Sequence, residues 1–190
     1  MEFKDLLIVV DAQNDFLLPT GKLFIGHDTT EYRKRLGEFV SKFPGYKIVT
    51  VDNHNKKAVE FELFPEHCLK DSEGCKIISE INQEIIDDFF SKNAYNSHNI
   101  SSAVARSLYG KIRTVGQVKL DSNADIYVVG VCTSICVHDI IIGIINETKN
   151  TYNQIPKIKI IRNLVDDFDP EMAEFSLKRL QKFYGVEIFI

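Results

Sequence analysis

The sequence predicts an α/β fold, a three-layer α/β/α sandwich around a mostly parallel sheet of roughly six strands. Two observations carry the prediction. Five short stretches are apolar on nearly every residue, and stretches with helical spacing of apolar residues lie between them. Strands that are apolar on both faces are typical of a parallel sheet covered by helices. Strands that alternate with helices imply right-handed crossovers, which place helices on both faces of the sheet.

The predicted strands are the apolar stretches themselves. Five are strong and one, the stretch DFFSK, is weaker because it contains fewer apolar residues. In chain order the six lie at residues 6–10, 47–51, 88–92 (the weaker one), 125–131, 157–161 and 186–190.

Three helices are predicted between these strands, at 29–43, 135–150 and 170–185. The last one has the clearest boundaries, because Asp169 is a capping residue, Pro170 suits a first helical turn and Gly185 suits a helix end. Two segments do not fit the scheme: the polar stretch 53–76, and 110–123. A long irregular segment inside a compact domain is often functional. The first helix has one apolar face, formed by Tyr32, Leu36, Phe39 and Val40.

Length and charge limit the classes of function. A chain of 190 residues is long enough to bury a full core, and we expect one domain over residues 1–190. The net charge is −4 and the basic residues are scattered, which argues against a nucleic-acid surface. The longest late apolar run, 140–145, is too short to cross a bilayer, and the N-terminal stretch does not resemble a signal peptide. We therefore expect a cytoplasmic protein with reduced cysteines, no nucleic-acid or membrane partner, and an oligomeric state left open.

Polar residues that could take part in catalysis follow the predicted strands. Asp11 follows the first strand, Asp52 the second and Lys92 ends the third, while the fourth leads into GVCTSICV, residues 130–137. Ligands of open α/β sheets bind outside the carboxyl ends of the strands. An aspartate after a strand is commonly a cap and a terminal lysine is commonly solvated, but these ordinary roles do not explain the joint arrangement. We therefore expect an active site at this edge of the sheet.

The two cysteines of GVCTSICV differ in their surroundings. Cys136 enters a predicted helix, where free N–H groups and the helix dipole lower the pKa of a thiol. Cys132 stands at the strand end, where its backbone matters more than its sulfur. His138 is two residues from Cys136, and positions i and i+2 of a helix do not face each other. A carboxylate with a lysine is the remaining way to activate the Cys136 thiol.

A metal site is suggested by the segment that begins at the second strand end. Asp52 and His54 are two residues apart, so in an extended chain both point the same way. His67 can close a site for a borderline divalent cation such as zinc. The same segment also contains Glu60, Glu62 and Glu66. From the spacing alone, a solvated loop with scattered His and Glu explains the pattern about as well.

Taken together, these stretches resemble the isochorismatase-like cysteine hydrolases, which have a Rossmann-type sandwich, and within them the nicotinamidases. The similarity covers nearly the whole chain, and it depends on the order and spacing of several motifs rather than on one of them. The matching stretches are DAQNDF with GKL after it, VDNH to FPEHC with SEG after it, SKNAYNS, GVCTSICV and DFDPEMAEFSLKRL.

This resemblance implies a role for each candidate residue. It implies a catalytic triad of Asp11, Lys92 and Cys136. It also implies a cis peptide bond at Val131–Cys132, which would turn the backbone N–H groups of Cys132 and Cys136 into an oxyanion hole. One divalent metal ion is implied as well, with zinc expected before iron or manganese. Its ligands would be Asp52, His54, Glu60 and His67, and Phe16, Phe64 and Tyr95 would line the substrate pocket.

The activity implied is hydrolysis of nicotinamide to nicotinate and ammonia, a reaction of NAD salvage, on a small-molecule substrate. Some positions depart from the family pattern: Ser134 replaces a common Asp, His98 replaces a common aromatic residue, and 110–123 is longer than usual. Phe64 stands where some relatives have a tryptophan. An amidase for another small amide or ureido compound is the alternative, and a non-catalytic binding protein is a third. Isochorismate hydrolysis is disfavoured because those enzymes lack the nucleophilic cysteine.

Overall fold

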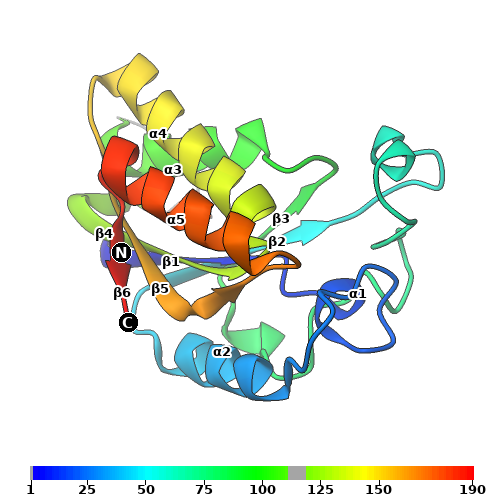
Figure 1. The fold of residues 1–190 in the computed structure, drawn as a ribbon. Helices are drawn as coiled ribbons and strands as arrows, with labels where there is room; N and C mark the ends of the chain where they lie inside the picture. Colours follow the sequence, from blue (N-terminus) through cyan, green and yellow to red (C-terminus); the bar gives the residue numbers. More distant parts are fainter. Residues whose placement is uncertain (1, 111–118) are drawn as a thin grey trace.

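The computed structural model describes residues 2–110 and 119–190, and a six-stranded sheet forms its centre (Figure 1). The strand order is β3-β2-β1-β4-β5-β6, and each neighbouring pair is parallel. The predicted α/β class with a parallel, roughly six-stranded sheet is therefore confirmed. The strands are β1 Glu2–Val10, β2 Tyr46–Asp52, β3 Asp88–Lys92, β4 Lys119–Val131, β5 Lys157–Asp166 and β6 Glu187–Phe189.

Helices cover both faces of the sheet, as Figure 1 shows. On one face lies α2 (Thr30–Lys42), and on the other lie α3 (His98–Tyr109), α4 (His138–Tyr152) and α5 (Pro170–Tyr184). Two hydrophobic clusters fill the spaces between these layers. Burial of this apolar surface is the main force that holds the three layers together. The short helical turns are α1 (Asn14–Leu17), η1 (Val59–Glu62), η2 (Gln83–Ile85) and η3 (Thr133–Val137).

The predicted boundaries of α5 agree with its hydrogen bonds. The Asp169 carboxylate accepts the backbone N–H groups of Glu171 at 2.9 Å and Met172 at 3.1 Å, as an N-cap does. Gly185 ends the helix with φ +70°, a backbone conformation in which glycine carries no steric penalty.

Two parts of the fold differ from the prediction. Helix α3 was not expected, although Ile100, Ala103, Val104 and Leu108 recur at helical spacing and form its buried apolar face. It forms because it packs closely on α4: a Cβ atom at Gly143 would lie 2.6 Å from Ser101 Oγ. Strand β4 begins at Lys119, so residues 119–123 of the segment expected to be irregular are strand. The rest of that segment from 111 to 118 lies outside the described residues.

The segment 53–76 is irregular, as expected, but its backbone is tied to the sheet. His54 N–H donates to Cys68 O at 3.0 Å, and Lys70 N–H donates to His54 O at 2.9 Å. These bonds form an isolated parallel bridge between His54 and Leu69. The loop therefore returns alongside the end of β2 and brings His67 back toward His54.

Candidate active site

Three strand ends and the first turn after a fourth strand meet at one edge of the sheet. Asp11 follows β1, Asp52 and Lys92 end β2 and β3, and Cys136 lies in η3 directly after β4. All four side chains are buried. The β2–β3 register pairs Asp52 with Lys92, and Asp11 N–H donates to Thr50 O at 3.1 Å. Strand pairing therefore brings Asp11, Asp52 and Lys92 together, and the turn after β4 adds Cys136.

The ammonium of Lys92 is the centre of this group. Its Nζ lies 2.7 Å from Asp11 Oδ2 and 3.4 Å from Cys136 Sγ, and it also donates to Asp52 Oδ1. Burial disfavours the ammonium, but its acidic neighbours outweigh this effect and raise the pKa of Lys92 well above its ordinary range. The lysine is therefore charged at neutral pH, pairs with the two carboxylates and would stabilise a thiolate at Cys136.

Asp11 is a buried carboxylate with a raised pKa. Burial raises the pKa of Asp11 to about 6, and the nearby Lys92 ammonium limits the rise. The Thr50 hydroxyl donates to Asp11 Oδ1 at 2.8 Å and fixes the carboxylate. A carboxylate with a pKa near the working pH can take up and return a proton in one reaction cycle.

The Cys136 thiol differs from the sequence-based expectation. Entry into a helix predicts a lowered pKa, but η3 is a single π-helical turn whose cysteine is buried. Burial raises the pKa of Cys136 well above its ordinary range, and the Lys92 ammonium only opposes that rise. The thiol therefore keeps its proton at rest and could act as a nucleophile only with a base beside it. Cys132 lies directly after β4, and the Val131–Cys132 peptide bond is cis, as the resemblance implies.

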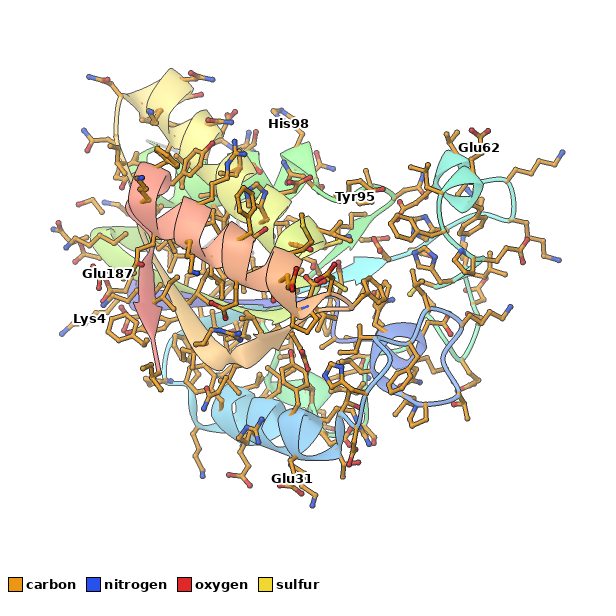
Figure 2. The ribbon with its side chains drawn as sticks, in the orientation of Figure 1. Lys4, Glu31, Glu62, Tyr95, His98 and Glu187 are labelled. Carbon is orange, nitrogen blue, oxygen red and sulfur yellow. The ribbon has the colours of Figure 1, made fainter. Side chains whose placement is uncertain are left out.

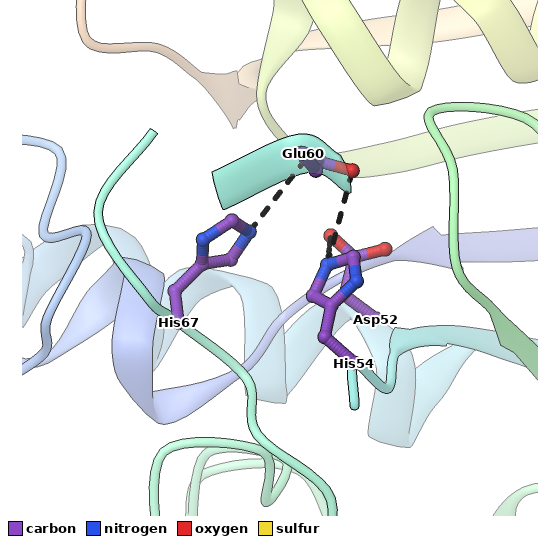
Figure 3. Close-up of side chains that lie close together, drawn as sticks. All are labelled: Asp52, His54, Glu60 and His67. Atoms are coloured by element: carbon purple, nitrogen blue, oxygen red, sulfur yellow. Dashed lines mark ion pairs between the residues drawn. The ribbon is translucent and has the colours of Figure 1, made fainter. Parts of the chain in front are cut away.

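Beside this group lies a second cluster, which we call the metal-type cluster: Asp52, His54, Glu60 and His67 (Figure 3). One ligand-type atom from each residue lies within 4.8 Å of the others. The Nε2 atom of His54 is 3.7 Å from Asp52 Oδ2, and that of His67 is 3.7 Å from Glu60 Oε1. These separations are too long for hydrogen bonds and leave space for an ion between the atoms.

The partners of the two histidines show that the cluster fits a cation. His54 Nδ1 lies 2.7 Å from Asn93 Oδ1, and His67 Nδ1 lies 2.8 Å from Pro65 O. These contacts place the ring protons on Nδ1 and leave both Nε2 lone pairs facing the cluster. The buried Nε2 of His54 has no hydrogen-bond partner. Two imidazole nitrogens and two carboxylates suit zinc and similar divalent ions.

Asp52 belongs to both groups, a role that the sequence did not indicate. Its Oδ1 accepts from Lys92, while its Oδ2 faces His54. Burial raises the pKa of Asp52, but the Lys92 ammonium and the nearby His54 together outweigh it and lower the pKa of Asp52. The carboxylate therefore stays ionised and joins the triad to the metal-type cluster.

A small pocket lies where the two groups meet. Phe16, Phe64 and Tyr95, the predicted substrate-binding residues, all line it. The rings of Phe64 and Tyr95 lie 6.4 Å apart and nearly perpendicular, at 88°. Leu23, Ile135 and Phe168 also line the pocket and were missed as wall residues, although each lies in or next to a quoted motif. The remaining lining residues are Asp52, Glu60, His67, Cys132 and Cys136.

Two buried residues of the DAQNDF motif hold the surrounding loops and were also missed. The Gln13 side chain accepts Asp52 N–H at 2.7 Å and donates to Asp52 O at 2.8 Å. The Asp15 carboxylate accepts Cys68 N–H at 2.6 Å and Lys22 N–H at 3.0 Å. Asp15 therefore fixes the residue after His67 and the residue before Leu23.

Other candidate residues lie outside the pocket. Glu62 is exposed and points outward from η1, and Glu66 is exposed as well (Figure 2). His98 is exposed at the start of α3, where its Nε2 lies 3.2 Å from Ser102 Oγ (Figure 2). All four cysteines are free, and the thiol of Cys75 lies 3.2 Å from Asp52 O.

A comparison with protein families identifies the fold. The profile of the Isochorismatase domain matches residues 5–188. The chain belongs to the isochorismatase family. A Bacillus subtilis (strain 168) protein described as the uncharacterized isochorismatase family protein PncA is 24% identical over 195 residues, 97% of this chain and 98% of that protein. The prediction of one domain over 1–190 stays a prediction.

Three solved structures of family members share the fold. A zinc complex of the pyrazinamidase of Pyrococcus horikoshii has a TM-score of 0.76 and 22% identity, covering 97% of this chain and 98% of its own. PnC1 from L. infantum in complex with nicotinate has a TM-score of 0.77 and 18% identity, covering 98% and 92%. N-carbamoylsarcosine amidase from Thermoplasma acidophilum has a TM-score of 0.68 and 18% identity, covering 98% and 95%.

Within the described ranges, no helix is both long and apolar enough to span a membrane.

Proposed function

We propose that this isochorismatase-family hydrolase is a cytoplasmic, cysteine-dependent nicotinamidase, which converts nicotinamide to nicotinate and ammonia in NAD salvage. The observation that carries the proposal is the shared pocket: Cys136 and three members of the metal-type cluster line one small cavity. The substrate that suits this pocket is a flat ring with an amide at one side and a metal-binding nitrogen at the other. Relatives that are described as a zinc complex and as a nicotinate complex support the same choice.

The first step is attack by Cys136. Asp11 takes the thiol proton, and Lys92, 3.4 Å from the sulfur, stabilises the thiolate. A bond forms between Sγ and the amide carbon, and the carbonyl oxygen becomes an oxyanion. Backbone N–H groups of Cys132 and Cys136 would donate to that oxygen, the task of an oxyanion hole. Asp11 acts as the base because its raised pKa matches a proton transfer near neutral pH.

The second half of the reaction returns every group to its starting state. The carbon–nitrogen bond breaks as Asp11 gives its proton to the leaving amine, which departs as ammonia. Water then loses a proton to Asp11 and attacks the thioester carbon. The carbon–sulfur bond breaks, and Cys136 regains its proton from Asp11. The acid product leaves as nicotinate.

The metal-type cluster has a separate task in this proposal. Asp52, His54, Glu60 and His67 would hold one divalent cation, with zinc expected before iron or manganese, and when bound it supplies a Lewis acid for the ring nitrogen. Phe16, Phe64 and Tyr95 pack around the ring and orient the amide toward Cys136. Correct orientation of a bound substrate can contribute several orders of magnitude to a rate.

Another small amide or ureido compound is the competing substrate class, since one structural relative is an N-carbamoylsarcosine amidase. N-carbamoylsarcosine carries a carboxylate, which a protein usually binds with a cationic side chain. The residues described around the pocket include no arginine or lysine, whereas they include Asp52 and Glu60. The side chains that line the pocket therefore offer no cationic partner for a carboxylate.

Ammonia release from a panel of amides tests the proposal. We expect metal-loaded protein to hydrolyse nicotinamide, and benzamide, which lacks the ring nitrogen, to react far more slowly. N-carbamoylsarcosine should also be a poor substrate. Faster turnover of the ureido compound than of nicotinamide would contradict the proposed substrate, and no turnover of any amide would favour a binding protein.

A further inference from the structure

The geometry of the metal-type cluster depends on which way the ring of His54 is turned. The strand pair β2–β3 ends with Asp52 opposite Lys92, and Asn53 N–H adds one more bond to Lys92 O at 3.0 Å. Asn93 follows Lys92, and its side-chain Oδ1 lies 2.7 Å from His54 Nδ1. A side-chain amide thus makes the next contact where the backbone ladder ends, and this contact holds a histidine of the cluster.

This contact decides which nitrogen of His54 is available to a cation. An amide oxygen only accepts, so the proton of the neutral ring is on Nδ1 and the lone pair is on Nε2. The buried Nε2 lies 3.7 Å from Asp52 Oδ2 and 3.9 Å from Glu60 Oε2, without a hydrogen bond. With the Asn93 amide turned over, its NH₂ would face Nδ1, and the proton would be on Nε2. That would point an N–H group, rather than a lone pair, at the place where a cation would bind, with no acceptor within hydrogen-bond distance.

We propose that Asn93 is a positioning residue that fixes the His54 ring for metal binding through Nε2. The proposal rests on the metal site of the proposed function, and it does not depend on which amide is the substrate. His67 provides an internal comparison, because its Nδ1 partner is the backbone oxygen of Pro65, which no side-chain substitution removes. Asn93 is exposed, so one surface side chain sets the affinity of a buried site.

Zinc affinity, measured by competition with a chromophoric chelator, tests this role in four variants. Asn93→Ala should bind zinc about 10- to 100-fold more weakly than the wild type, the usual effect of losing such a partner. Asn93→Asp should bind as tightly or more tightly, because a carboxylate also accepts from Nδ1. Asn53→Ala is the matched control, because Asn53 lies between Asp52 and His54 and its side-chain oxygen is 3.9 Å from the Cys75 thiol. The zinc affinity of this variant should change by about twofold at most. His54→Ala gives the full loss for comparison.

A second readout separates positioning from general damage. In zinc-loaded protein the Nδ1 proton of His54, followed by NMR, should exchange slowly with solvent in the wild type and rapidly in Asn93→Ala. Alkylation of Cys136 should keep its wild-type rate in both. Wild-type zinc affinity in Asn93→Ala, or equal losses in the Ala and Asp variants, would overturn the role of Asn93. If His54→Ala also binds zinc normally, the metal site of the proposed function fails instead.

Discussion

Asp11, Lys92 and Cys136 stand at or directly after the ends of strands, whereas three of the four residues in the metal-type cluster come from the loop 53–76. The triad is held by strand register and by one buried ion pair. The metal-type cluster is held by hydrogen bonds that close a long loop, among them those of Asp15 and Asn93. Asp52 is the residue that connects the two. Under the proposed function, one pocket thus combines chemistry fixed by the sheet with substrate placement fixed by a loop.

The largest effect is expected at the nucleophile. Cys136→Ala should lower turnover on the order of 10⁴-fold or more, because no other group forms the thioester. Its zinc content and thermal unfolding should match the wild type, since the metal-type cluster does not depend on the thiol. Cys132→Ala is the matched control and should keep most activity, because only its backbone is assigned a role. Equal losses in the two variants would show that the assignment of a single nucleophile is wrong.

The next effect concerns the ion pair inside the triad. Lys92→Ala should lower turnover about 100- to 1,000-fold and destabilise the fold by about 3–5 kcal/mol, because two buried carboxylates lose their cation. Asp11→Asn should lower turnover about 10²- to 10⁴-fold by removing the base. The losses should not add in the double variant, since triad members act as a unit. Steady-state kinetics and thermal unfolding of the three proteins provide the measurement, and fully additive losses would contradict a joint role.

A smaller effect follows from the raised pKa of Asp11. The base must be ionised, and its pKa in the folded protein is about 6 rather than 3.8. We therefore expect kcat/KM to fall by about tenfold per pH unit below pH 6 and to level off above it. Metal content must be measured at each pH, because loss of the ion would produce a similar decline. A profile that stays flat to pH 5 with the metal retained would argue against Asp11 as the base.

The smallest effect is expected from loosening the loop that carries the metal-type residues. Asp15→Asn keeps the size of the side chain but replaces one acceptor with an NH₂ group, opposite either Cys68 N–H or Lys22 N–H. Stability should fall by about 1–3 kcal/mol, and zinc affinity should fall with it. Asp28→Asn is the control, because this exposed residue accepts Thr30 N–H at the start of α2, a bond that an asparagine oxygen also accepts. Unchanged zinc affinity in Asp15→Asn would show that the loop does not need this anchor.

The sequence predicted the proximity of Asp11, Lys92 and Cys136 better than the contacts around them, for a physical reason. Parallel strands end at one edge, so residues that follow them, such as Asp11 and Lys92, can be placed together from the chain order alone. The closure of the loop by Asp15 and the contact of Asn93 with His54 depend on tertiary packing, which no spacing rule contains. The prediction of a low thiol pKa at Cys136 was wrong, because it considered the helix entry and not the burial of the side chain, which raises the pKa. Helix α3 was missed although Ile100, Val104 and Leu108 have the spacing of an apolar helix face, so at this helix the signal was present in the sequence.

The most direct test of the whole account uses one sample of chelated protein and two assays. The account predicts that turnover of nicotinamide falls by about 100-fold or more, since misplacement of a substrate by roughly 1 Å can cost that much. It also predicts that a small alkylating agent modifies Cys136 at close to its normal rate, because the metal places the substrate and Lys92 and Asp11 activate the thiol. Restoring zinc should restore turnover. Full hydrolysis of nicotinamide by the chelated protein would contradict the account and favour a metal-independent amidase.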